Sequence, residues 1–262
     1  MKTLLHNALK TVAATGFVMA IAPAQAGLIF QVQEGSVSGA VPNLITSDRI
    51  AGSWEQTLNF LGGSALNSGG YISFSDFKLG AVTPPNQLSP SVPQSIFEGA
   101  NNYGMYAIFN WAGSLSGTTI NGATGSLSLW IDPSQNTTKT APVAGSQTVT
   151  LGGTGEDYQI GAASLLAAGV DPPPGTASWN LTYEPFTLVG SGASYFVAPI
   201  DFYVRLNLTS EINEPFCSPA PCSTTTSGEA SAQFAVPEPG ALALLGISLV
   251  GLGLARRRPK VV

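Results

Sequence analysis

The stretch Phe202-Tyr203-Val204-Arg205-Leu206-Asn207-Leu208 places large apolar side chains at positions 202, 204, 206 and 208. A second stretch, Trp54-Glu55-Gln56-Thr57-Leu58-Asn59-Phe60, places them at 54, 58 and 60, with Thr57 at a polar position. Successive side chains of a β-strand point to opposite faces, so a period of two indicates one buried and one solvated face. Both stretches therefore predict amphipathic β-strands.

Short apolar runs of this kind recur along the whole chain. The candidate strands cover residues 28–33, 53–60, 71–79, 103–115, 125–131, 147–151, 178–189, 195–210 and 230–236. One segment, 160–168, has a helix-like pattern and is expected to pack on a sheet edge. Many strands with few helices predict an all-β fold, a single antiparallel β-sandwich, with a jelly roll as the alternative.

Glycine, asparagine and proline separate these strands. Asn121-Gly122 lies between apolar runs and is typical of a two-residue type I′ hairpin turn. Further turns are predicted at residues 62–63, 67–70, 83–85, 152–153 and 171–175. We expect one β-rich body over residues 27–222, then a segment 223–235 made of a polar linker and a last strand.

The charge of the chain is unevenly distributed. The 262 residues include 10 Lys+Arg, 15 Asp+Glu and one histidine, His6. Residues 27–236 keep only Arg49, Lys78, Lys139 and Arg205 against 14 acids, a net charge of −10. So few cations exclude binding along a phosphate backbone, and we expect no nucleic-acid partner. A body without histidine also excludes histidine-dependent catalysis and histidine-ligated metal sites.

The N-terminus has the three parts of a secretory signal peptide. Lys2 and Lys10 supply the positive charge, and residues 11–22 form a short apolar run. Ala24 and Ala26 form a small-residue cleavage site, so signal peptidase is expected to cut between Ala26 and Gly27. Residues 1–26 are therefore predicted to be removed during export.

Three unlike features follow one another at the C-terminus. The first is the motif Val236-Pro237-Glu238-Pro239-Gly240. The second is an uncharged segment, 240–255, that would span about 24 Å as a transmembrane helix. The third is a basic cluster over 256–260 that begins with Arg256, Arg257 and Arg258. Basic residues favour the cytoplasmic side, so this helix would anchor the chain in the inner membrane with the body outside.

This tail, residues 236–262, resembles the PEP-CTERM sorting domain of exported bacterial proteins, also called the ice-binding protein C-terminal domain. The resemblance implies that an exosortase of the inner membrane processes the protein. It further implies a Gram-negative producer of exopolysaccharide. The chain would be anchored only transiently before it reaches the cell surface or extracellular matrix.

Two segments of the body are similar to the flocculation-associated subgroup of PEP-CTERM proteins. They are residues 30–60, which include Ser47-Asp48-Arg49-Ile50-Ala51-Gly52-Ser53-Trp54-Glu55, and residues 195–211, YFVAPIDFYVRLNLTSE. This resemblance implies a role in floc or biofilm formation. It supplies no catalytic residues.

The two cysteines, Cys217 and Cys222, are separated by four residues that include two prolines. Export would allow them to form a disulfide, and the short proline-containing loop favours a structural staple. A redox-active pair is the less favoured alternative, because active pairs have two intervening residues and a following helix.

Without histidine, the catalytic mechanism that remains possible for the body is one that uses carboxylates alone. Two positioned carboxylates suffice for glycoside hydrolysis, but no motif singles out a pair. Residues 132–136 offer an aspartate beside polar side chains, and residues 152–157 offer glycines and two acids. Both stretches lack a complete calcium-loop pattern and are predicted to be ordinary turns. We therefore expect no catalytic residue, no metal site and no cofactor.

Trp54, Trp111, Trp130 and Trp179 could stack on sugar rings, but large aromatics in amphipathic strands are more often core residues. We expect them to be buried. The sequence favours a non-enzymatic adhesive β-domain that supports exopolysaccharide-dependent cell aggregation. Two alternatives stay open, a carboxylate-dependent polysaccharide hydrolase and a structural envelope protein without a ligand.

Overall fold

The structure is a computed structural model, and it describes residues 29–88, 102–116, 119–171, 177–198, 203–210 and 220–235. The predicted signal peptide, Cys217 and the tail from Val236 onward lie outside these residues. Among the residues that are described, no helix is both long enough and apolar enough to cross a membrane.

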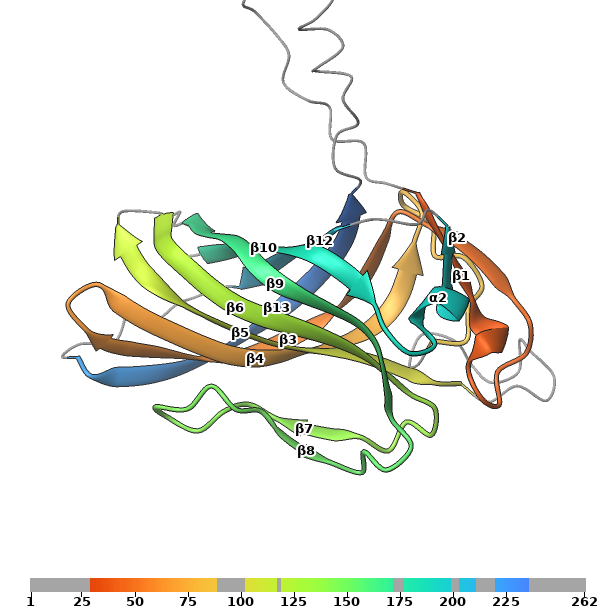
Figure 1. Cartoon of the computed structure of the whole chain (residues 1–262), viewed down its shortest axis with the longest axis horizontal. Helices are drawn as coiled ribbons and strands as arrows, with labels where there is room; N and C mark the ends of the chain where they lie inside the picture. Colours follow the sequence, from red (N-terminus) through yellow and green to blue (C-terminus); the bar gives the residue numbers. More distant parts are fainter. Residues whose placement is uncertain are drawn as a thin grey trace, which may run out of the picture.

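Eight long antiparallel strands close into a barrel (Figure 1). Each strand pairs with the next one around the barrel, and the last strand in the chain pairs with the first, which closes it. In this closing pair the register runs from Cys222 opposite Phe60 to Ala232 opposite Ile50. In order around the barrel the strands are β3 (Arg49–Gly62), β4 (Ala65–Lys78), β5 (Gly104–Ser116), β6 (Thr119–Asp132), β9 (Tyr158–Asp171), β10 (Ala177–Leu188), β12 (Tyr203–Ser210) and β13 (Cys222–Ala235).

The all-β antiparallel prediction is confirmed, but the main sheet is one closed barrel and not the two facing sheets of a sandwich. Both architectures need the same alternation of apolar and polar residues, so the pattern could not separate them. Closure requires strands that bend. The register shifts between Ala51 and Gly52, and again within the β5–β6 and β6–β9 pairs, which is how bulges add local curvature.

Two local predictions are corrected by the strands. Residues 160–168 belong to β9 and not to a helix. Their small side chains leave room for the aromatic ring of Phe186, which lies where a Cβ on Gly161 would be. Asn121 and Gly122 lie inside β6, because Ser116 already pairs with Thr119.

Two further segments, predicted to be a turn and a linker, also lie in strands. Residues 67–70 lie within β4. The segment 223–235, expected to begin with a polar linker, belongs wholly to β13, whose residues from Cys222 to Ala232 pair with β3. By contrast, the turn at 62–63 is confirmed. Gly62, the last residue of β3, and Gly63, which follows it, have φ of 113° and 61°, a conformation that favours glycine.

The barrel interior is a packed apolar core. Trp54 and Trp111 are 2% and 0% exposed, which confirms their predicted burial. Trp130 is only half-buried; its ring stacks on Tyr106 at a centroid distance of 6.3 Å. The side chain of Trp179 lies outside the described ones.

A small sheet covers one end of the barrel (Figure 1). It consists of β11 (Phe196–Ala198), β1 (Phe30–Gln33) and β2 (Leu44–Ser47), with the short helices η1 (Glu34–Ser36) and α2 (Gly192–Tyr195) beside it. The ring of Phe30 contacts Phe77 of the barrel and Phe196 of β11, with centroids 6.4 and 6.1 Å apart. We call these elements the plug.

A long excursion between β6 and β9 runs along the outside of the barrel beside β3 and β4 (Figure 1). It contains the hairpin β7 (Thr138–Thr140) and β8 (Thr150–Gly152). Thr57 donates to the carbonyl of Pro142 at 2.5 Å, and Asn59 donates to the carbonyl of Ser146 at 2.9 Å. We call residues 133–157 the strap.

Six of the seven tyrosines have pKa values above the ordinary value, chiefly because burial penalises the phenolate. For Tyr71 burial and the nearby Glu55 carboxylate raise the pKa to about 12. A raised folded-state pKa contributes stability that is complete below the unfolded value of about 10 and is lost as the pH rises above it. The tyrosines are Tyr71, Tyr103, Tyr106, Tyr158, Tyr183 and Tyr195.

We therefore expect alkaline unfolding above about pH 10. Tyrosinate absorbance should appear together with the loss of β-sheet circular dichroism. Gradual titration of most tyrosines near pH 10, with the circular dichroism unchanged, would contradict this expectation.

Candidate functional site

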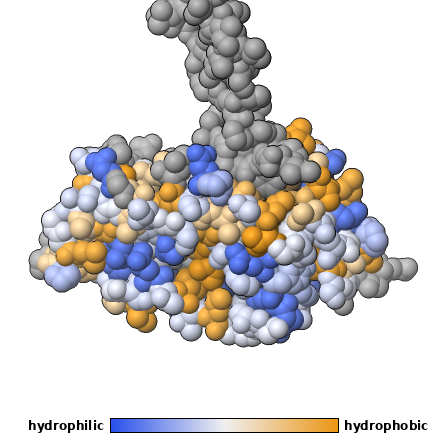
Figure 2. Space-filling model, in the orientation of Figure 1, coloured by the Kyte–Doolittle hydropathy of each residue, from blue (hydrophilic) through white to orange (hydrophobic). Residues whose placement is uncertain are grey.

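A pocket of about 680 Å³ lies between the plug and the loops that join β6, the strap and β9. Its walls present hydroxyl, amide, carboxylate and phenol groups. They are Ser38 and Gly39 after η1, Asn102 before β5, Pro133, Ser134 and Gln135 after β6, and Glu156 and Tyr158 where the strap meets β9. The exposed face in Figure 2 has small hydrophobic patches separated by hydrophilic ones.

The turn after β6 is organised by Asp132. One of its carboxylate oxygens accepts from the backbone N–H of Thr137 at 2.9 Å, and the other accepts from that of Asn136 at 3.3 Å. Aspartate commonly stabilises turns by such bonds to the backbone that follows it. Gln135 takes a positive φ of 56° inside this turn, and it forms part of the pocket wall.

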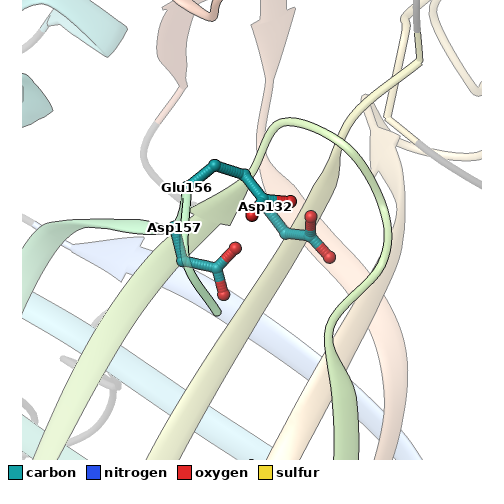
Figure 3. A group of neighbouring side chains, drawn as sticks. All are labelled: Asp132, Glu156 and Asp157. Atoms are coloured by element: carbon teal, nitrogen blue, oxygen red, sulfur yellow. The ribbon is translucent and has the colours of Figure 1, made fainter. Parts of the chain in front are cut away.

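Three carboxylates meet beside the pocket: Asp132, Glu156 and Asp157 (Figure 3). Each offers an oxygen that lies within 4.8 Å of the others. Asp157 Oδ2 accepts from the hydroxyl of Tyr106 at 2.6 Å and from that of Thr137 at 2.7 Å. Glu156 Oε1 and Asp157 Oδ1 are shielded from solvent and have no hydrogen-bond partner among the described residues.

Lys139 of β7 is the nearby cation. Its Nζ donates to the carbonyl of Thr137 at 3.2 Å and lies 5.0 Å from the centroid of the Tyr106 ring. Burial lowers the pKa of Lys139, while Asp132 and Asp157 act in the opposite direction. Burial and the hydrogen bond to Asp157 raise the pKa of Tyr106, so Tyr106 stays a neutral donor.

In chemical terms the cluster is a source of negative potential at the pocket edge. Its three carboxylates supply only part of the six to eight oxygens that Ca²⁺ takes. Asp132 and Asp157 also carry out structural hydrogen bonding. The sequence-based expectation of no metal site stays a prediction.

The structure brings together two stretches that no sequence pattern connects. Asp132 and Glu156 are 24 positions apart and come together because the strap leaves the barrel and returns at the same edge. Both stretches were predicted to be ordinary turns. Gln135 belongs to the first of these turns, whereas no sequence pattern indicated Ser38, Asn102 and Tyr158, since they are residues of common types in separate loops.

Most of the residues singled out from the sequence lie at the chain ends. Cys222 is the first residue of β13 and is disulfide-bonded, while its predicted partner Cys217 lies outside the described residues. The cleavage-site residues Ala24, Ala26 and Gly27 and the tail residues also lie outside them.

Residues 235–258 match the family model of the PEP-CTERM protein-sorting motif. The chain carries a PEP-CTERM sorting motif. This confirms the resemblance drawn from Val236 to Gly240 and from Arg256 to Arg258, and it makes the protein an exported substrate of exosortase that is sorted to the cell surface. The match begins at Ala235, where β13 ends, so the PEP-CTERM motif directly follows the barrel. No curated protein and no solved structure matches the chain.

Proposed function

We propose that the barrel is a non-catalytic adhesive domain, and that this PEP-CTERM protein supports exopolysaccharide-dependent cell aggregation in flocs or biofilms. The observation that carries the proposal is the pocket at the plugged end of the barrel. Its volume of about 680 Å³ suits a short segment of a polymer, since ligand sites commonly enclose about 300–1,000 Å³.

The chemistry of the pocket wall favours a sugar. The ring of Tyr158 is half-buried and can stack on the apolar face of a pyranose. Ser134 offers a hydroxyl, and Asn102 and Gln135 offer amides that can both donate to and accept from sugar hydroxyls. The net charge of −10 over residues 27–236 repels anionic polymers, so a neutral polysaccharide is the favoured ligand.

The arrangement of the acids favours binding over hydrolysis. Glycosidases need two carboxylates free to act on the same bond. In the pocket wall, as far as the structure describes it, Glu156 is the one carboxylate. The oxygens of Asp132 accept from backbone N–H groups, and one oxygen of Asp157 accepts from two hydroxyls.

Delivery follows from the sorting signals. We propose that signal peptidase removes residues 1–26 and that the segment 240–255 holds the chain transiently in the inner membrane. Exosortase processing would then leave the barrel at the cell surface or in the matrix. Because the motif starts where β13 ends, cleavage there would leave the barrel strands complete.

The test compares the mature protein with its Tyr158→Ala and Tyr71→Ala variants. Tyr71 is a half-buried tyrosine on the outside of β4, so it is a matched control away from the pocket. The probe is the neutral fraction of the exopolysaccharide secreted by the producing strain. We expect Tyr158→Ala to weaken binding about tenfold through the loss of ring stacking, and Tyr71→Ala to leave it unchanged.

Isothermal titration would give the affinities, and circular dichroism would check that each variant is folded. Release of reducing sugar from the polymer by the unmodified protein would favour the hydrolase alternative. No affinity at millimolar sugar would favour the structural envelope protein and contradict the proposal.

A further inference from the structure

Glu34 is a fully buried carboxylate at the start of η1, with 0% of its surface exposed. Its Oε1 accepts from the backbone N–H of Gln87 at 2.7 Å and from the hydroxyl of Tyr103 at 3.0 Å. Its Oε2 accepts from Asn43 Nδ2 at 2.7 Å and from Gln87 Nε2 at 3.1 Å. Among the described residues no lysine or arginine forms an ion pair with it.

These four bonds join separate segments of the plug to the barrel. Gln87 also binds the backbone of Val41 on both sides, because its Oε1 accepts from the N–H at 2.8 Å and its Nε2 donates to the carbonyl at 2.9 Å. Tyr103 leads into β5, and its hydroxyl lies 2.6 Å from that of Tyr195 in α2. Burial raises the pKa of Tyr103, so it remains a phenol that donates to Glu34.

Two walls of the pocket are attached to this network. Ser38 and Gly39 lie in the loop that Glu34 begins and that Gln87 holds at Val41. Asn102 immediately precedes Tyr103. The remaining walls come from β6, β9 and the loops between them, which the barrel itself holds.

We infer that Glu34 is the positioning residue of the pocket. Its carboxylate accepts hydrogen bonds from Gln87, Tyr103 and Asn43, and through them it fixes the positions of Ser38, Gly39 and Asn102 in the pocket wall. The ligand side of this inference rests on the proposed function, whereas the positioning itself does not. A buried carboxylate is costly unless its oxygens are satisfied, and here both oxygens accept two bonds each. If one of these oxygens is replaced by a hydrogen-bond donor, that donor faces the N–H or O–H groups that bonded to the oxygen, and they lose their acceptor.

The decisive variant is Glu34→Gln in the mature chain, because glutamine keeps the shape of the side chain and replaces one acceptor oxygen with an N–H₂ group. The readout is hydrogen exchange of the amides at Val37, Ala40 and Val41, each of which is hydrogen-bonded in the loop. We expect these amides to exchange about tenfold faster or more, since a buried donor loses its acceptor. Affinity for the neutral exopolysaccharide fraction should fall in parallel.

Leu66→Ala is the matched control. Leu66 is 3% exposed and is the second residue of β4, at the end of the barrel away from the plug. Its truncation therefore destabilises the fold without changing any group of the Glu34 network. At a temperature where both variants are folded, Leu66→Ala should leave the exchange of the three amides unchanged. Equal acceleration in both variants, or none in Glu34→Gln, would overturn the inference.

Tyr103→Phe provides a milder test should Glu34→Gln fail to fold. It removes one of the four donors and the contact with the Tyr195 hydroxyl. The same amides should exchange faster, by a smaller factor, and an unchanged pattern would contradict the inference. If exchange responds as expected but the unmodified protein binds no polysaccharide, the proposed function fails and the positioning role stands.

Discussion

Replacing Trp111 with alanine is expected to lower the free energy of unfolding by about 3–5 kcal/mol. Trp111 points into the barrel from β5, and none of its surface is exposed. Its strand neighbours in register are Ser68 on one side and Gly125 on the other, both too small to fill the space left by an indole. The truncation therefore removes buried apolar area and leaves a cavity, which are the two parts of such a penalty.

Trp130→Ala is the matched control, because the same substitution is made one strand away on the outside of the barrel. Trp130 is half-buried, and its loss removes the stack on Tyr106 without opening the core. Chemical denaturation of the purified protein should give a cost below about half of that for Trp111→Ala. Similar costs for the two variants would show that the barrel interior is not packed as described.

The strands could be predicted where apolar and polar residues alternate along the chain. The closure of the barrel could not be predicted. The stretch 54–60 indicated the strand β3 from its own residues. Its pairing with β13 joins residues more than 160 positions apart, and no local pattern encodes that contact. Thr57 and Asn59 show the consequence. Their positions predicted a solvated face, yet each is 1% exposed because the strap covers them.

Glycine explains one of the wrong local predictions. The pair Gly69-Gly70 predicts a turn, because glycine is common where the chain reverses. In β4 both glycines instead admit close neighbours, since a Cβ on Gly70 would meet the side chains of Gln56 and Phe109 at 2.7 Å. Glycine in a strand can equally mark a close approach of another segment, and the sequence does not say which applies.

The candidate site was less predictable than the fold. Asp132 and Glu156 belong to two turns that were expected, and only the return of the strap to the same barrel edge joins them. Ser38, in the plug, and Asn102, before β5, are both linked to a hydrogen-bond network centred on Glu34, a residue that no sequence pattern distinguishes. The sorting motif was predictable because its residues are contiguous, so that recognition did not depend on folding.

Replacing Gly69 with alanine is expected to lift the strap from the barrel and to cost about 2–4 kcal/mol of folding free energy. A Cβ at this position would overlap the carbonyl oxygen of Gln147 and lie 2.6 Å from its carbonyl carbon. Backbone atoms cannot rotate away, so the strap must move. That movement would break the bond that the Gly145 N–H donates to Asn59 and the bond that Asn59 donates to the carbonyl of Ser146. It would also break the bonds that Gln147 donates to the carbonyls of Ser68 and Trp111.

Trypsin gives a direct readout of this movement. Lys139 is the only lysine or arginine between Lys78 and Arg205, so cleavage within the strap can occur at this one position. In the unmodified protein Lys139 is half-buried against the Tyr106 ring, and we expect slow cleavage. In Gly69→Ala the lifted strap should be cut much faster, and thermal unfolding should occur at a lower temperature.

Gly155→Ala is the control for the substitution itself, because Gly155 lies in the strap and a Cβ there would meet nothing within 4 Å. It should leave both cleavage and stability unchanged. If Gly69→Ala lowered stability while Lys139 stayed protected, the strain would be absorbed by β4, and the strap would be a fixed part of the barrel wall. Rapid cleavage with little loss of stability would instead show that the barrel folds without the strap, whose bonds to Thr57 and Asn59 would then contribute little.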